Sequence, residues 1–483
     1  MIDLTQDDGD SEPAEHLFIE FASDVLDWLQ KHVSSGDIDI PRVPREYIHF
    51  TPNSYREVVG DSVDYGEALI KGFHASLSSL PSARRCAERL IRNKTLPSLA
   101  DYRKHQDALE GKARITEDVE LESLLVSVLA TYSSPVAELF TAIADLLSRC
   151  QSLQPPESSV IAAYKRFVSY RTATHLLYEN TVLLQNFRTD VPHMEIGQSL
   201  DLQAFTPDDK TELWNTYGRN LNVGFHQFGE ASFKLVARHW VRRWKELPIT
   251  HMMLGDVRRV LTALRLLKPG DVGAQFVYAI MHLTPFSANI GALPLFGCRT
   301  RQFGSCEYEL QRAEVPQLLV LYETLDALEQ QRKPGGLDVA LRRFNQSYER
   351  DTGEDRIIDL TIALESCLLT GIQDELRYRL ALRGAALLSD TADPAYTQSQ
   401  LETIYDIRSK IVHEGLRLSD KTIAKRLDKM EPSIEAHEWP DSCQDIVRAV
   451  LREYVRRLSE DKDVRTVNSE LDMRIVGGLA RMQ

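Results

Sequence analysis

Cysteine is sparse and scattered in this sequence. The 483 residues include six cysteines, and no two of them are spaced CxxC. This distribution is typical neither of a disulfide framework nor of a structural zinc site. We therefore expect reduced thiols, as in a cytoplasmic protein.

Long apolar runs are also missing. The most apolar stretch, VGAQFVYAIMHLTPFSANIGALPLFG, is interrupted by His282, Pro285, Asn289 and Pro294, which excludes it as a membrane-spanning helix. The beginning of the chain, MIDLTQDDGDSEPAEH, is acidic and lacks the basic start of a signal peptide. Both absences predict a cytoplasmic protein that does not use a membrane.

Familiar catalytic signatures are absent as well. The sequence contains no Walker loop and no GxGxxG, HExxH or GxSxG motif, which removes most nucleotide-binding, metalloprotease and hydrolase classes. The net charge of −14 argues against a protein that binds nucleic acid through bulk positive charge. It does not exclude RNA bound at a small, locally basic site.

The hydrophobic pattern predicts a mainly α protein with several parts, because 483 residues are too many for one core. We expect a disordered tail over residues 1–12, an all-helical region over 13–155 and a mixed α/β region over 160–332. A helical bundle follows over 337–460, and a C-terminal tail over 461–483.

Local signals support this division. Leu17, Phe21, Val25 and Leu29 recur every four residues, as in an amphipathic helix. HLLYENTVLLQNF and MEIGQSLDLQAF have the composition and alternation of strands, whereas TPDD and DVRRVLTALRLL indicate helices. After the linker KPGG come LDVALRRFNQSYER, EDRIIDLTIALESCLL, DELRYRLALRGAALL, QSQLETIYDIRSKIVH and CQDIVRAVLREYVRRL, which predict five helices.

The order of these last segments, ending in IYDIRSKIVHEG, resembles the ApeA-like branch of the HEPN superfamily. The likeness is good over about residues 337–415 and looser over 160–332. It implies a C-terminal HEPN bundle with a sensor or regulatory region before it. It also implies a homodimeric, metal-independent endoribonuclease without cofactors, often acting in defence against phage, with RNA as substrate and a phage-derived trigger as partner.

The family motif, Arg followed by His after four to six residues, falls on Arg408 and His413. The resemblance makes these two residues catalytic, with Ser409 and Glu365 in support. Arginine can hold two phosphate oxygens, and imidazole can act as acid or base. Ser409 departs from the Asn, Asp or His that many active members carry after the arginine.

Alternatives remain open at each position. Arg408 and His413 could simply cap and solvate a helix end, and Glu365 could be an exposed carboxylate. Arg379 and Arg383 could bind RNA phosphates, form a solvated face, or pair with Asp355 and Asp359. The whole bundle could also be a non-catalytic HEPN module for dimerisation or for binding a nucleotide or protein.

Three other Arg–His pairs compete with the motif: Arg42 with His49, Arg188 with His193, and Arg219 with His226. None of them is expected at the end of the fourth helix of a bundle. Between Arg408 and His413, we expect Ile411 and Val412 to face the core.

Overall fold

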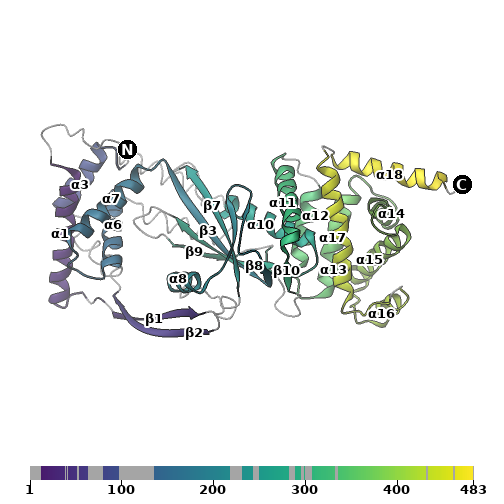
Figure 1. Cartoon of the computed structure of the whole chain (residues 1–483), viewed down its shortest axis with the longest axis horizontal. Coiled ribbons are helices and arrows are strands. Elements are labelled where there is room, and N and C mark those ends of the chain that lie inside the picture. Colours follow the sequence, from purple (N-terminus) through teal and green to yellow (C-terminus); the bar gives the residue numbers. More distant parts are fainter. Residues whose placement is uncertain are drawn as a thin grey trace.

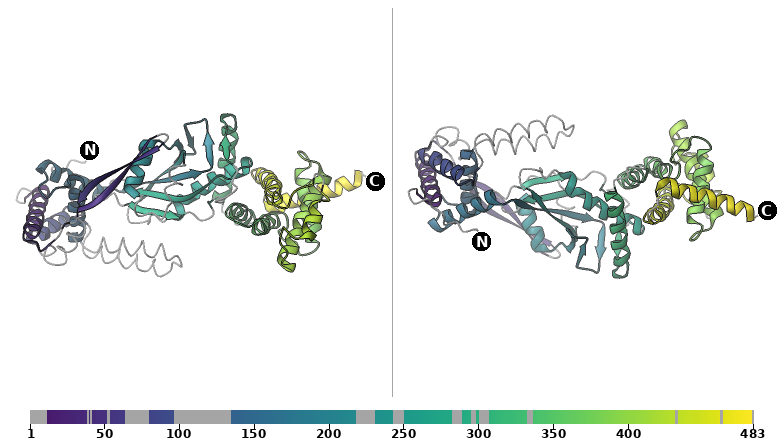
Figure 2. Two further views of the ribbon diagram at one scale, coloured as in Figure 1. Left: turned by 90° about the horizontal axis from the view of Figure 1, so that it is seen from below. Right: turned by 90° about the horizontal axis from the view of Figure 1, so that it is seen from above.

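The computed structural model is elongated, with a group of helices at one end, a β-sheet in the middle and a helical bundle at the other end (Figures 1 and 2). It describes residues 12–38, 40, 42–51, 54–63, 80–96, 135–217, 231–242, 250–281, 289–294, 298–299, 307–331, 336–430, 433–460 and 463–481. The expected tail before Glu12 and two stretches of the expected all-helical region, 64–79 and 97–134, lie outside the described residues. The prediction of a mainly helical protein is confirmed, and the strands of the middle region form an antiparallel sheet.

In the described residues of the N-terminal part, four helices share one core. They are α1 (Ala14–Ser34), α3 (Pro81–Arg92), α6 (Pro135–Cys150) and α7 (Glu157–Thr172). The predicted stripe of Leu17, Phe21, Val25 and Leu29 is buried in this core. Because Phe167 of α7 is also buried there, this part of the chain extends beyond the boundary expected at residues 155–160.

A β-hairpin corrects the expectation that residues 13–155 are all helical. Strands β1 (Arg42–Thr51) and β2 (Ser54–Val63) pair antiparallel over their whole length. Their sequences, RVPREYIHFT and SYREVVGDSV, are rich in β-branched and aromatic residues, which favour an extended backbone. The helical periodicity on either side of this segment does not extend into it.

The central sheet has six strands in the order β5-β6-β7-β3-β8-β9, all paired antiparallel. The strands are β3 (His175–Gln185), β5 (His193–Ile196), β6 (Leu200–Ala204), β7 (Phe233–Arg242), β8 (Gly273–Met281) and β9 (Asn289–Pro294). A short parallel pair joins β4 (Phe187–Thr189) to β10 (Tyr308–Leu310). The strands predicted from HLLYENTVLLQNF and MEIGQSLDLQAF are thus confirmed.

Helices flank this sheet. Helix α8 (Pro207–Tyr217) begins after Thr206, whose hydroxyl accepts a hydrogen bond from the Asp209 N–H at 3.2 Å, as the TPDD signal predicts. Helix α10 (Thr250–Leu267) packs against β7 and stops just before Lys268. Helix α11 (Val315–Gln330) packs against α10.

The sheet and the bundle share one continuous hydrophobic core, which contains both Val182 of β3 and Leu471 near the C-terminus. At their junction the fully buried Arg265 of α10 donates to the Asn345 side chain of α12 (Gly336–Ser347) at 3.0 Å. Arg448 of α17 (Trp439–Leu458) donates in turn to the carbonyl of Arg265 at 2.7 Å. The KPGG linker, of which residues 333–335 lie outside the described ranges, therefore does not separate two independent cores.

The bundle contains the helices predicted for it. Besides α12 and α17 these are α13 (Gly353–Leu368), α14 (Leu376–Leu388) and α15 (Pro394–Glu414). A short helix not anticipated from the sequence, α16 (Lys421–Leu427), connects α15 to α17. Leu360, Leu364, Leu380 and Ile404 are among the residues that fill the interior.

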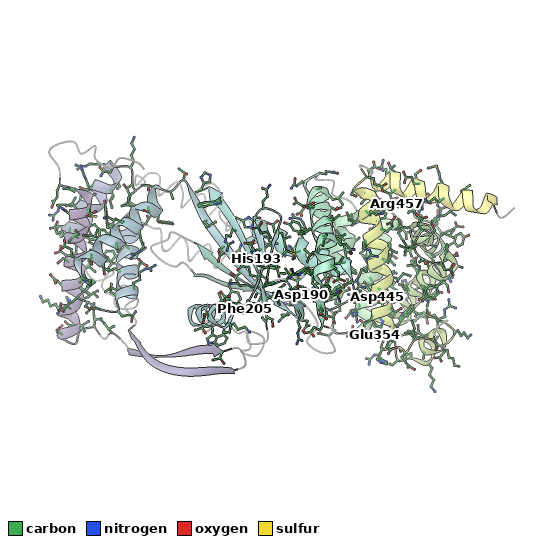
Figure 3. The ribbon with its side chains drawn as sticks, in the orientation of Figure 1. Asp190, His193, Phe205, Glu354, Asp445 and Arg457 are labelled. Atoms are coloured by element: carbon green, nitrogen blue, oxygen red, sulfur yellow. The ribbon has the colours of Figure 1, made fainter. Side chains whose placement is uncertain are left out.

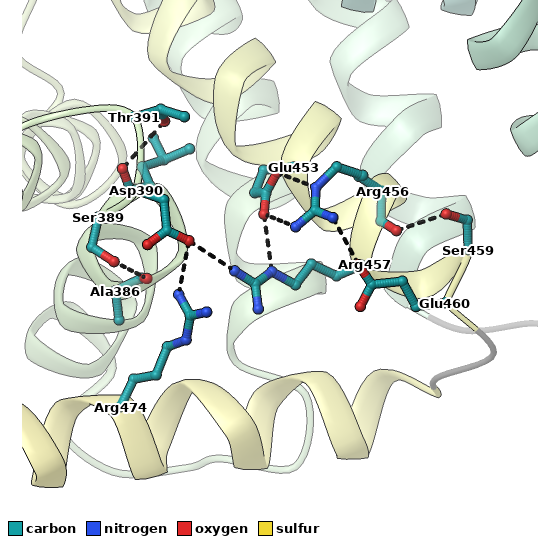
Figure 4. A network of polar contacts seen from close by, with 11 residues as sticks. Ala386, Ser389, Asp390, Thr391, Glu453, Arg456, Arg457, Ser459, Glu460 and Arg474 are labelled. Carbon is teal, nitrogen blue, oxygen red and sulfur yellow. Dashed lines mark hydrogen bonds and ion pairs between the residues drawn. The ribbon is translucent and has the colours of Figure 1, made fainter.

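The segment expected as a C-terminal tail is instead helix α18 (Val464–Arg481), which is fastened to the bundle. Val467 and Leu471 are buried, and Asn468 donates to the carbonyl of Cys367 at the end of α13. Figure 4 shows Asp390, in the loop after α14, between Arg457 of α17 and Arg474 of α18. This segment is a helix and not a tail because Val467 and Leu471, four residues apart in a polar sequence, form one apolar stripe that packs on the bundle.

Candidate functional site

Helix α15 sets the position of Arg408 and His413. It starts at Pro394, and the side chain of the preceding N-cap residue, Asp393, accepts a hydrogen bond from the Tyr396 N–H at 3.1 Å. It ends at Gly415, whose φ of +67° is the left-handed conformation that glycine adopts readily at a helix end. The RSKIVHEG stretch therefore occupies the last two turns of α15, as its glycine predicts.

Arg408 lies on the side of α15 that faces α13. Its side chain is 21% exposed, and its Nη2 atom lies 3.9 Å from the Glu365 carboxylate, which is too long for a hydrogen bond. The Nε atom is buried, and the guanidinium forms no hydrogen bond with any residue that the structure describes. Arg408 thus keeps its donors available beside a single carboxylate.

Every other buried or half-buried arginine that the structure describes in the bundle donates at least one hydrogen bond. The buried Arg356 donates to Asp441 and Gln444 at 2.5 and 2.6 Å. Arg343 and Arg350 both donate to Asp359, at 2.9 and 2.7 Å. A buried donor without an acceptor costs about 1–3 kcal/mol, and no residue that the structure describes supplies a hydrogen-bond acceptor to the Arg408 guanidinium.

Glu365 and Tyr405 complete the surroundings of Arg408. Burial raises the pKa of Glu365, and the charge of Arg408 partly opposes this shift. Burial, together with the Glu365 carboxylate, also raises the pKa of the Tyr405 phenol. The charge of Arg408 opposes this rise in the pKa of Tyr405. Tyr405 was not predicted from the sequence, although its position one turn before Arg408 on the same helix could have indicated it.

His413 is exposed near the end of α15, and Ser409 is half-buried one residue after Arg408. On a helix, positions five apart differ by about 140° and about 7.5 Å along the axis, so Arg408 and His413 do not lie on one narrow stripe of α15. A single chain therefore brings Glu365, Tyr405 and Arg408 together and leaves His413 facing outward.

Of Ile411 and Val412, which were both expected to face the core, only Ile411 does so. Ile411 is half-buried and packs against the core, but the side chain of Val412 is 46% exposed. The expectation for Val412 was wrong because the buried stripe of α15 passes through Leu401, Ile404 and Ile407. Val412 is about 140° around the helix from Ile407.

The two expected RNA-binding arginines have different positions. Arg379 is 46% exposed and lies 3.7 Å from Glu375. Arg383 is instead buried, where it donates to both carboxylate oxygens of Asp472 at 2.8 and 2.6 Å and also to the carbonyl of Leu368. We correct its role accordingly: Arg383 fastens α18 to α13 and α14 and is not placed to bind RNA. It does not pair with Asp355 or Asp359 either.

Comparisons of the chain with protein-family models, with curated proteins and with solved structures find no match. In the part of the chain that the structure describes, no three His, Cys, Asp or Glu side chains gather as a metal site. No described helix is long and apolar enough to cross a membrane. The functional argument therefore depends on the local geometry of the bundle.

The competing Arg–His pairs lie in other settings. Arg42 and His49 are both on strand β1. Arg188 on β4 pairs with Glu307, whereas His193 on β5 lies 3.6 Å from Asp201, in the sheet region that Figure 3 shows well away from the bundle. Arg219 and His226 lie outside the described residues. Of the described pairs, only Arg408 and His413 occupy one helix end.

Proposed function

We propose that the protein is a cytoplasmic endoribonuclease of the HEPN type, with Arg408 and His413 as its catalytic residues. The observation that carries the proposal is the half-buried guanidinium of Arg408, which forms no hydrogen bond with the described residues. Arginine presents a planar fork of donors that matches phosphate oxygens. A phosphate of bound RNA would supply the missing acceptor.

The chemistry is attack of an RNA 2′-hydroxyl on the adjacent phosphate. The reaction needs a base at the 2′-oxygen, an acid at the leaving 5′-oxygen and positive charge on the pentacoordinate phosphorane. The products are a 2′,3′-cyclic phosphate and a 5′-hydroxyl. In this scheme Arg408 holds the phosphate, while the charge of the Glu365 carboxylate attracts its guanidinium, with Ser409 in support.

The exposed position of His413 supports a composite site at a two-fold axis. Two α15 ends would bring two histidines to one RNA strand, so that one could act as base and the other as acid. The site as proposed needs no metal or cofactor. A tRNA loop is the substrate class we favour, because the splayed bases of loops are the part of RNA that proteins read.

A nuclease that cuts cellular RNA has to be restrained, and we assign this role to the residues before the bundle. The core shared by sheet and bundle supports direct coupling between them. We infer that a phage-derived trigger acts on the upstream region, as in abortive-infection defence.

The test uses purified full-length protein incubated with total RNA in excess chelator. We expect fragments that end in 2′,3′-cyclic phosphate, loss of cleavage in His413→Ala, and unchanged cleavage in the control Glu414→Ala, its exposed neighbour. Intact RNA at high protein concentration would refute nuclease activity and favour a non-catalytic HEPN module.

Mixing Arg408→Ala with His413→Ala protein tests the composite site. If each active site draws residues from both chains, mixed dimers should recover part of the cleavage that both variants lack alone. Dimer formation is checked in parallel by light scattering. Absence of recovery in proven mixed dimers would place both catalytic residues in one chain.

A further inference from the structure

A basic segment follows the candidate site in an otherwise acidic chain. From Arg408 to Lys429 there are seven Lys and Arg residues against three Asp and Glu, a local charge of +4, whereas the whole chain carries −14. The segment comprises the last turns of α15, helix α16 and their connections. The proposed nuclease site is therefore next to a locally basic segment, although the net charge of the whole chain is negative.

Helix α16 presents its cations outward. Ile423 and Leu427 are buried in the core and fix the inner face of the helix. Lys421 and Lys425 are exposed and one turn apart, about 6 Å along the axis. Lys429, one further turn along in sequence, is also exposed.

The bundle holds this segment in a fixed place beside the candidate site. Arg426 of α16 lies 3.4 Å from Asp406 of α15, which is two residues before Arg408. The Leu418 N–H donates to Glu354 at the start of α13 at 2.8 Å, and Figure 3 shows Glu354 at the side of the bundle where α16 lies. The surface is thus preorganised with respect to the end of α15.

The outward cations have no ion-pair partner among the residues that the structure describes. Arg417, Lys421, Lys425 and Lys429 form no ion pair with any residue that the structure describes, whereas Arg426 does. Asp420 lies on the same segment, but its carboxylate accepts the backbone N–H of Arg417 at 2.7 Å. Glu414 and Asp428 are the other carboxylates of the segment, and both are exposed.

We propose that Arg417, Lys421, Lys425 and Lys429 bind successive phosphates of the RNA strand that enters the site at His413. This inference rests on the proposed function, because continuity with Arg408 and His413 is what favours RNA over an acidic protein. Lysine acts as a point charge on phosphate and reads no sequence. The surface would therefore determine affinity and strand direction, not base preference.

The experiment measures binding of a fluorescein-labelled single-stranded RNA to full-length protein by anisotropy over a series of salt concentrations. All proteins carry His413→Ala so that RNA is not cut. The test variant adds Lys421→Gln, Lys425→Gln and Lys429→Gln. The matched control adds Lys31→Gln, Lys94→Gln and Lys165→Gln, three exposed lysines of the N-terminal part, so both variants lose three charges.

Each phosphate contact to a single strand contributes about 0.7 to the slope of log affinity against log salt. We expect the slope of the test variant to be smaller by about 2 and its affinity at low salt to fall at least tenfold, with the control unchanged. An unchanged slope in the test variant, or an equal loss in the control, would overturn the inference. If the His413→Ala parent binds no RNA and the native protein cuts none, the proposed function itself fails.

Discussion

Replacing Arg265 with methionine tests whether the sheet and the bundle form one folding unit. Arg265 is fully buried at their junction, and its guanidinium lies 4.3 Å from the ring centroid of Tyr348, which follows directly after α12. It donates five hydrogen bonds of 2.8–3.4 Å, to the carbonyls of Val272, Cys298, Arg299 and Asn345 and to the Asn345 side chain. Methionine keeps much of the apolar stem and removes every one of these bonds.

The expected loss of stability follows from these contacts. Each buried acceptor left unpaired costs about 1–3 kcal/mol, although the carbonyl of Cys298 keeps a second bond from the Ala274 N–H at 2.7 Å. Relief of the buried charge offsets part of this loss, and that burial is also what lowers the pKa of Arg265. We therefore expect Arg265→Met to lower the free energy of unfolding by about 3–5 kcal/mol.

Hydrogen exchange measured by mass spectrometry shows which segments lose amide protection in Arg265→Met. Peptides from β7 and from α17 should lose protection together, because both belong to one core, whereas α1 should be unaffected in its separate core. Arg265→Lys should lower the free energy of unfolding by nearly as much, since one ammonium group cannot replace the planar set of donors of the guanidinium. The control is Arg342→Met, at an exposed position of α12. Loss of protection in the sheet while α17 stays protected would refute a single folding unit.

Four further substitutions test the packing and the electrostatics of the bundle. Ile411→Ala should cost about 1–2 kcal/mol because the side chain is half-buried, whereas Val412→Ala, at an exposed position, should stay within about 0.5 kcal/mol by chemical denaturation. The pKa of Glu365 is raised in the folded protein, so the folded state binds more protons than the unfolded state above pH 4.5. The stability of the native protein therefore falls as pH rises from 4.5 through the folded pKa. Glu365→Gln removes this titrating group and should flatten the dependence of stability on pH in that range. A parent and variant with parallel stability curves from pH 4.5 to 7 would contradict this. Asp472→Asn should destabilise by about 1–2 kcal/mol at pH 7, since a hydrogen bond from Arg383 lowers the pKa of Asp472. That stabilisation is complete above pH 3.8 and is lost as pH falls through the lowered pKa of Asp472. The stabilities of the parent and of Asp472→Asn should therefore converge in acid. A stability difference that stays constant with pH would argue against the ion pair.

Local signals in the sequence were sufficient for much of the secondary structure. The bundle helices α12 to α15 and α17, the strands β3, β5 and β6, the Thr206 cap and the glycine end of α15 all depend on periodicity and on capping residues within a few positions. The placement of Arg408 and His413 at a helix end follows from the same signals. Such features are decided by neighbours along the chain, so they can be predicted without knowing the fold.

Other features depended on contacts between distant segments. Arg383 is buried only because Asp472, 89 residues later, reaches it from α18, and the sequence alone leaves the same arginine free for RNA. The joint core of sheet and bundle exists because α10 and α17 meet at Arg265 and Arg448, which are 183 residues apart. The lack of acceptors around Arg408 is likewise a tertiary property, because it depends on where Glu365 and every other carboxylate come to lie. Charge and hydrogen-bonding capacity are properties of a residue, but whether they are satisfied is decided by packing.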